Sequence, residues 1–185
     1  MSLYVGFTEY VAGQDPLGDA IARMAEKRLP ELREKYPYQH CYLVCGHPAI
    51  GFHRAEMFSS GLSYVWYPAG GENFQKGIIF QFDNPDMELQ AIYRILDPWT
   101  RNCTKTSKRQ LIRMFHGEIM VWPDIMKGEF TCTTFVLWTL GLLGLPHRSV
   151  ELIEALRARA DLFREYQVND SSEETPQSIR WVPES

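Results

Sequence analysis

The sequence predicts an α+β fold in which helices pack against an antiparallel β-sheet. Three observations support this fold class: a helical pattern opens the chain, several short strand-like runs follow one another, and helical patterns return in the second half. Runs of strands followed by runs of helices are typical of α+β domains. With 185 residues, 45% of them apolar, the chain is long enough for one domain with its own core. We place that domain at residues 1–168.

The first elements are expected to be a helix and a β-hairpin. The helix begins at Asp15-Pro16, because Asp is a common N-cap residue and Pro fits the first helical turn. Pro30 is expected to kink or end this helix. Two strand-like runs, residues 41–45 and 49–54, then flank a Gly-His-Pro break and predict an antiparallel hairpin.

The middle of the chain adds two strands and a helix. The strands are expected at residues 62–68 and 77–82, and the helix opens at Asp86 and closes at Asp97-Pro98. One apolar face is expected on this helix, formed by Leu89, Ile92, Tyr93 and Leu96.

Three helical segments are expected in the second half. They are a short helix over residues 104–116, a strongly apolar helix over about 132–143, and a last helix over roughly 149–165. Thr131 is placed to cap the apolar helix, since Thr is a favoured N-cap residue. Residues 169–185 are polar and are expected to form a flexible tail.

The charge distribution gives no reason to expect a nucleic-acid partner. The formal net charge is −4 and is spread without large blocks. The basic residues are scattered except for one short run: Lys105, Lys108, Arg109 and Arg113. We interpret that run as a solvated helix face. No cofactor is expected either.

The chain is expected to be cytoplasmic and to have no transmembrane segment. Its N-terminus has no basic leader, and the apolar run from Phe135 to Leu145 is about half the length that a membrane helix needs. In a reducing compartment cysteines are thiols by default. We therefore predict free thiols rather than two disulfides for Cys41, Cys45, Cys103 and Cys132.

Cys132 is the candidate nucleophile. It falls in the first turn of a predicted helix, where unpaired N–H groups and the helix dipole stabilise a thiolate. The alternative is that Cys132 is a small core residue, since free cysteine is among the most buried residue types. A thiol nucleophile needs an imidazole within hydrogen-bond reach, so the positions of the histidines bear on this choice.

Two of the five histidines lie in the predicted hairpin. His40 starts its first strand and His53 ends its second. If the hairpin turns at about Gly46-His47, His40 faces residue 53 or 54. His40 and His53 would then lie together at one end of the sheet, as a general base and its orienting neighbour. The other histidines are expected in a turn, in loops or at helix ends: His47, His116 and His147.

A zinc cluster is the competing interpretation of the hairpin, because histidine and cysteine are zinc ligands. The candidate ligands are His40, Cys41, Cys45, His47 and His53. Alternation along a strand places His40 and Cys41 on opposite faces, and the Cys-x3-Cys spacing differs from the usual Cys-x2-Cys. We therefore expect no metal site, and we expect Cys41 and Cys45 in the core.

The segment "YQHCYLVCGHPAIGFHRAE" resembles the His-containing hairpin of the lecithin retinol acyltransferase-like proteins. In that family Tyr-x-His opens a strand, and a second histidine follows at the end of the next strand. "TCTTFV" resembles the family's Asn-Cys-Glu-His-Phe-Val, in which the cysteine heads a helix, although Thr-Thr stands here in place of Glu-His. These proteins belong to the circularly permuted NlpC-type, papain-like hydrolases, in which His precedes Cys along the chain.

The resemblance implies a papain-like fold in permuted order, with an antiparallel sheet or half-barrel packed against the N-terminal end of the cysteine-bearing helix. It implies a thiol hydrolase or acyltransferase in which Cys132 is the nucleophile, His40 the general base and His53 the orienting residue. A backbone N–H at the head of the helix, that of Cys132 itself, would help to stabilise the oxyanion. The substrate would be a peptide, an isopeptide or an acyl lipid, cleaved at an amide, ester or thioester bond. The alternative is a non-catalytic binding module on the same fold.

Overall fold

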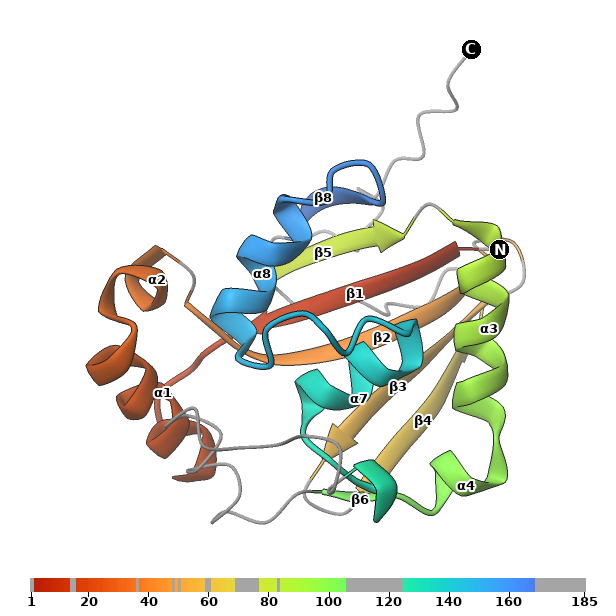
Figure 1. Ribbon diagram of the computed structural model, residues 1–185, viewed down its shortest axis with the longest axis horizontal. Helices are drawn as coiled ribbons and strands as arrows, with labels where there is room; N and C mark the ends of the chain where they lie inside the picture. Colours follow the sequence, from red (N-terminus) through yellow and green to blue (C-terminus); the bar gives the residue numbers. More distant parts are fainter. Residues whose placement is uncertain are drawn as a thin grey trace.

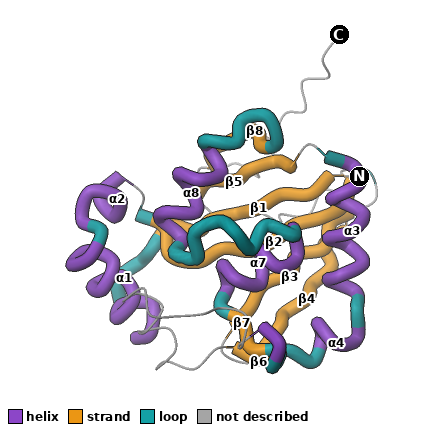
Figure 2. Tube along the Cα trace, viewed as in Figure 1, coloured by secondary structure: helices purple, strands orange, loops and turns teal. Residues whose placement is uncertain are grey.

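The computed structural model describes residues 2–13, 16–35, 37–47, 49, 51–58, 61–68, 77–82, 84–105 and 125–168. Within these residues the chain forms an α+β fold with a six-stranded antiparallel sheet and several helices (Figures 1 and 2). The predictions made for Asp15, for His116, for residues 106–116 and for the tail at 169–185 lie outside the described residues.

The sheet has the strand order β4-β3-β2-β1-β5-β8, and each neighbouring pair in it is antiparallel. Its strands are β1 (Ser2–Glu9), β2 (Tyr38–His47), β3 (Gly51–Phe58), β4 (Gly61–Pro68), β5 (Gly77–Phe82) and β8 (Phe163–Val168). A second, two-stranded sheet pairs β6 (Thr104–Lys105) with β7 (Glu129–Phe130) in parallel. The strands predicted at 62–68 and 77–82 are confirmed as β4 and β5.

The central strand β1 was not predicted from the sequence. Leu3, Val5 and Phe7 of this strand belong to the main core, and Tyr4 belongs to a smaller apolar cluster on the opposite face. A strand that is buried on both faces lacks the alternation of apolar and polar residues by which a half-buried strand is recognised. This is why the first strand of the chain gave no clear signal.

Helices cover one face of the sheet and one of its ends. They are α1 (Pro16–Arg28), α2 (Pro30–Lys35), α3 (Pro85–Leu96), α4 (Pro98–Arg101), α7 (Cys132–Leu140) and α8 (Ser149–Arg157). Figure 1 shows α3, α7 and α8 in front of the sheet and α1 with α2 beside it. α7 is the most deeply buried of these helices, since Phe135, Val136 and Leu137 are fully enclosed. None of the described helices is both long enough and apolar enough to cross a bilayer.

The expected apolar face of α3 is wrong. Leu89 is 53% exposed and Tyr93 is 67% exposed, and the residues that α3 buries are Glu88, Ala91 and Ile95. Arg94 explains this orientation, because its Nη1 donates hydrogen bonds to the carbonyl oxygens of Trp138 and Thr139 at the end of α7 (3.1 and 2.8 Å). A cation in this position satisfies carbonyls that have no partner within the helix.

The C-terminal helix is shorter than expected. α8 ends at Arg157, and residues 163–168 form β8 rather than the end of a helix over 149–165. The helical spacing of buried residues stops at Leu156, and Phe163 of β8 packs against Phe82 of β5 with ring centroids 4.9 Å apart. Similarly, residues 104–105 form β6, so the short helix expected over 104–116 does not begin there.

Candidate active site

The predicted hairpin forms, but its register differs from the expected one. β2 and β3 pair Leu43 with Ala55 and Cys45 with His53. His53 therefore lies opposite Cys45, and the expectation that His40 faces residue 53 or 54 is wrong. The reason is that β2 continues through Gly46 instead of turning there. A Cβ at Gly46 would lie 2.3 Å from the carbonyl oxygen of Gly51, so the glycine serves a close approach of the two strands.

The candidate site lies where β2 and β3 part. Their ladder ends at Leu43 and Ala55, yet β2 extends back to Tyr38 along β1 and β3 extends to Phe58 along β4. α7 packs against both strands (Figure 1). Side chains from β2, β3 and the head of α7 can therefore meet at this end of the hairpin.

His40 is held by a buried ion-pair network. Its Nε2 lies 3.0 Å from Oε2 of Glu56, and Nη2 of Arg54 donates to the same oxygen at 2.8 Å. Glu56 is 6% exposed and Arg54 is 4% exposed. Because Nε2 is engaged by the carboxylate, Nδ1 is left as the ring nitrogen that can exchange a proton with another group. The contact expected from His53 is thus made by Glu56.

Cys132 stands in the first turn of α7, and the turn is fixed by a reciprocal cap. Thr131 is the N-cap residue, as predicted, and its Oγ1 accepts a hydrogen bond from the backbone N–H of Thr134 at 3.0 Å. Oγ1 of Thr134 in turn accepts from the backbone N–H of Thr131 at 2.8 Å. Thr133 adds a hydrogen bond from its Oγ1 to the carbonyl oxygen of His147. The helix ends at Leu140, earlier than the expected residue 143.

The surroundings of Cys132 favour a thiolate. A hydrogen bond with the Cys41 side chain lowers the pKa of Cys132, while burial raises it. Hydrogen bonding and charge interaction with His40, and a hydrogen bond with the Cys41 backbone, lower it further. The pKa of Cys132 therefore lies well below its ordinary value of 9.0. The residue as a whole is partly buried.

His40 shifts in the complementary direction. Burial alone would lower the pKa of His40, but hydrogen bonds and charge interactions with Cys132 and Glu56 raise it to about 9. Burial raises the pKa of Glu56, but His40 and Arg54 lower it by more, so Glu56 stays ionised. The three shifts act together: they favour a thiolate at Cys132, an imidazolium at His40 and a carboxylate at Glu56.

The remaining cysteines are free thiols, as predicted. Cys41 and Cys45 are buried in the core, which confirms the position expected for them. Burial raises the pKa of Cys41 well above 9.0, so Cys41 remains protonated and can donate its S–H to the Cys132 sulfur. In the part of the chain that the structure describes, no group of three or more His, Cys, Asp or Glu side chains is placed to hold a metal ion.

The structure also describes the side chains of two other histidines, His53 and His147. The ring of His53 stacks on Tyr64 with centroids 4.9 Å apart, and its Nδ1 is buried without a hydrogen-bond partner among the described residues. His147 lies just before α8, and burial lowers its pKa. Neither ring takes the place of Glu56 beside His40.

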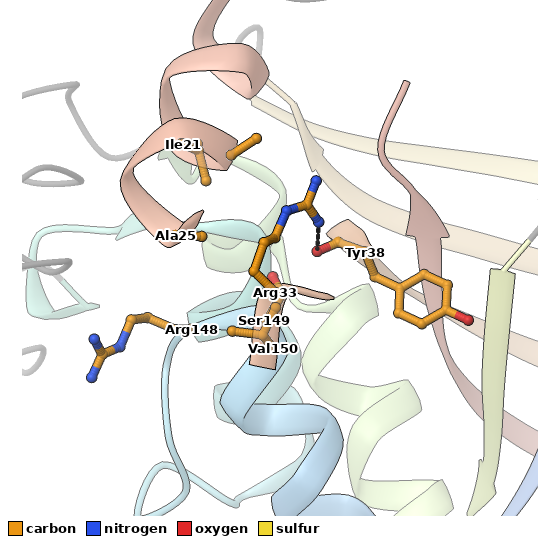
Figure 3. A pocket seen from close by; sticks show the side chains of 8 residues that line it. Ile21, Ala25, Arg33, Tyr38, Arg148, Ser149 and Val150 are labelled. Atoms are coloured by element: carbon orange, nitrogen blue, oxygen red, sulfur yellow. Dashed lines mark hydrogen bonds between the residues drawn. The ribbon is translucent and has the colours of Figure 1, made fainter. Parts of the chain in front are cut away.

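A small cavity lies at the same end of β2 as His40 (Figure 3). α1, α2, the start of β2 and the start of α8 line it. Figure 3 shows the Arg33 side chain beside the apolar residues Ile21 and Val150, with its guanidinium directed at the carbonyl oxygen of Tyr38 (3.5 Å), and Arg148 pointing away. The wall of the cavity therefore combines apolar surface with one buried cation.

Comparison with protein families, with curated proteins and with solved structures finds no match to this chain. The candidate site therefore rests on the arrangement of its own side chains. That arrangement brings Cys132 and His40 together, and it adds Glu56, Arg54 and Cys41 from the hairpin.

A signal for two of these added residues exists in the sequence. Arg54 and Glu56 stand two positions apart in a predicted strand whose neighbours are apolar, so their side chains share one face of it. Charged residues are rarely buried unless they are paired. Two charges of opposite sign on one face of a core strand therefore indicate a buried ion pair, and such a pair is a candidate part of a functional site.

Proposed function

We propose that this chain is a cysteine-nucleophile hydrolase or acyl transferase with a papain-like fold in permuted order. One observation carries the proposal: Cys132, at the head of α7, contacts His40, whose Nε2 is bound by the buried carboxylate of Glu56. A nucleophile, a base and a group that orients the base form the constellation of thiol hydrolases. The order of His40 before Cys132 along the chain agrees with the permuted NlpC-type pattern.

The reaction would proceed through a thioester. The Cys132 thiolate attacks the carbonyl carbon of an amide, ester or thioester, and the C=O electron pair moves onto the oxygen. The tetrahedral intermediate collapses, the bond to the leaving group breaks, and the His40 imidazolium protonates that group. Water, or a second acceptor in a transferase, then attacks the acyl-enzyme while neutral His40 takes its proton. Collapse expels the Cys132 thiolate and restores the initial pair.

Glu56 takes the role that the sequence analysis gave to His53. A carboxylate on Nε2 fixes the orientation of the imidazole and stabilises its positive charge. Its hydrogen bond to Nε2 directs Nδ1 to the proton transfer with Cys132 and the leaving group. His53, which stacks on Tyr64, has no part in these steps.

The head of α7 supplies an oxyanion site. The reciprocal cap uses the backbone N–H groups of Thr131 and Thr134. The N–H groups of Cys132 and Thr133 also lie in the first turn, where the backbone donors of a helix have no acceptor within the helix. They are available to the developing oxyanion, together with the positive end of the helix dipole.

The substrate class follows from the chemistry of a thiol nucleophile. A peptide or isopeptide amide and an acyl-lipid ester or thioester all present the carbonyl that Cys132 would attack. The reaction needs a reduced thiol, so the proposal places the protein in a reducing compartment such as the cytoplasm. It needs neither a metal nor a cofactor.

The experiment is to trap the acyl-enzyme. The full chain is mixed with p-nitrophenyl acetate near neutral pH, quenched in acid and analysed by intact mass and peptide mapping. One acetyl group should appear on Cys132 in a rapid burst and be lost on standing. Cys103→Ala is the matched control, since Cys103 is buried and burial raises its pKa to about 11. A burst that survives in Cys132→Ala, or no adduct on Cys132 in the parent, would favour a non-catalytic binding module.

A further inference from the structure

The Glu56 carboxylate, which binds His40, also forms an ion pair with Arg54. Oε2 of Glu56 accepts one hydrogen bond from His40 and a second from Arg54, at 3.0 and 2.8 Å. The guanidinium carbon of Arg54 lies 4.0 Å from the centroid of the Tyr42 ring, which is fully buried. Arg54 therefore touches Glu56 and Tyr42 in a site closed to solvent.

Strand register fixes this arrangement. Val44 pairs with Arg54 across the β2–β3 ladder, so Tyr42, two residues before Val44, lies on the same face as Arg54 and diagonal to it. Glu56 follows Arg54 by two residues and shares that face. The Arg54 side chain is thus positioned by regular strands rather than by a loop, which favours a precise geometry.

Gly6 provides the space for the Tyr42 ring. Gly6 of β1 pairs with Tyr42, and a Cβ placed on Gly6 would lie 2.2 Å from Cζ of that ring. Such a distance is far inside van der Waals contact, so any side chain at this position must displace the ring. Gly6 is therefore required because the Tyr42 ring packs against its backbone, and not because the chain turns there.

We propose that Arg54, seated between Glu56 and the Tyr42 ring over Gly6, is a positioning residue for the Cys132–His40 pair. The proposal rests on the function proposed above. Arg54 touches neither the nucleophile nor the base, and it acts through Glu56: it fixes the carboxylate oxygen on His40 Nε2 and keeps Glu56 ionised.

The chemistry of the guanidinium suits this role. Arg stays protonated at all accessible pH values, whereas a buried Lys loses its proton more readily. Its planar group can donate to a carboxylate and stack on an aromatic ring at the same time. Without Arg54 a buried Glu56 would protonate more easily, and its hold on the imidazolium of His40 would weaken.

The test measures the pH dependence of iodoacetamide labelling at Cys132. Arg54→Met should move the labelling midpoint upward by up to about one pH unit, because loss of an opposite charge in contact raises the pKa of Glu56 by about 1–3 units and only part of that change reaches Cys132 through His40. Arg54→Lys should move it less, because the charge remains. In the Glu56→Gln background Arg54→Met should add little further change, because the residue acts through Glu56.

Arg94→Met is the matched control. Arg94 also binds α7, but at its far end, through the carbonyl oxygens of Trp138 and Thr139. This variant should lose stability and keep the parent's labelling midpoint. If Arg54→Met does not fold by circular dichroism, the Arg54→Lys comparison in both backgrounds decides the question.

The outcomes separate the two proposals. A parent midpoint near that of free cysteine would refute the catalytic pair itself. Two results would refute the positioning role and leave the proposed function intact. In the first, the parent midpoint is low and neither Arg54 variant changes it. In the second, the Arg54 variants change it by the same amount with Glu56 and with Gln at position 56.

Discussion

Replacement of Glu56 by glutamine isolates the charge that holds His40. Glutamine keeps the shape of the side chain and an oxygen that can accept from Nε2 of His40, but it carries no charge. We expect the His40 ring to stay in place and its imidazolium to lose stability. In a plot of activity against pH, the rise on the acidic side reports the pKa of Cys132 and the fall on the basic side reports the pKa of His40. The first pKa should move upward and the second downward, so the active pH range narrows from both sides.

The size of the effect follows from the pKa of His40. That pKa is about 9 instead of 6.5, and the difference corresponds to roughly 3 kcal/mol at about 1.4 kcal/mol per pKa unit. Cys132 and Glu56 together produce this increase against the opposing effect of burial. If Glu56 supplies a third to a half of it, Glu56→Gln should lower the pKa of His40 by about one unit.

The assay is an NMR titration of the histidine ring nitrogens, which reads His40 without relying on activity. His53→Asn is the control, because the His53 ring stacks on Tyr64 and should leave the His40 titration unchanged. A His40 pKa near 6.5 in the parent would refute the reasoning. So would a parent value that His53→Asn lowers and Glu56→Gln does not, since His53 would then be the orienting residue.

Three further predictions concern the surroundings of the pair. Cys41→Ala should raise the labelling midpoint of Cys132, because the hydrogen bond from the Cys41 thiol that lowers the pKa of Cys132 is lost; an unchanged midpoint would contradict that contact. Thr131→Ala should reduce the free energy of unfolding in urea by about 0.5–2 kcal/mol, whereas Thr131→Ser should retain the cap and most of the stability. The pKa of Glu56 lies below its ordinary 4.5, so ionised Glu56 stabilises the fold above that pH and the contribution is lost as the pH falls through the folded-state value. The stability of the parent relative to Glu56→Gln should therefore decline below about pH 4.5, and a constant difference would contradict the ion pair.

Local signals in the sequence predicted the elements that local chemistry determines. Thr131 was recognised as a cap from residue type and position, and the hairpin was recognised from its two strand-like runs around Gly-His-Pro. The nearness of Cys132 and His40 followed from a helix start and a strand start, with support from a family resemblance.

Features that depend on tertiary packing were not predictable in the same way. The register of β2 against β3 depends on where the chain turns. The predicted turn was wrong by a few residues, so the prediction placed His53 beside His40, where the structure has Glu56. The orientation of α3 depends on the contact of Arg94 with the end of α7, which no helical periodicity contains. β1 is buried on both faces, so its apolar residues follow one another without the alternation that identifies a strand in a sequence.

The most direct test of the account is the pH dependence of iodoacetamide labelling at Cys132 in the parent and in His40→Ala. We expect a midpoint well below that of free cysteine, and a clear upward movement in His40→Ala. A parent midpoint at or above that of free cysteine, unmoved by His40→Ala, would contradict the thiolate–imidazolium pair and return Cys132 to the core.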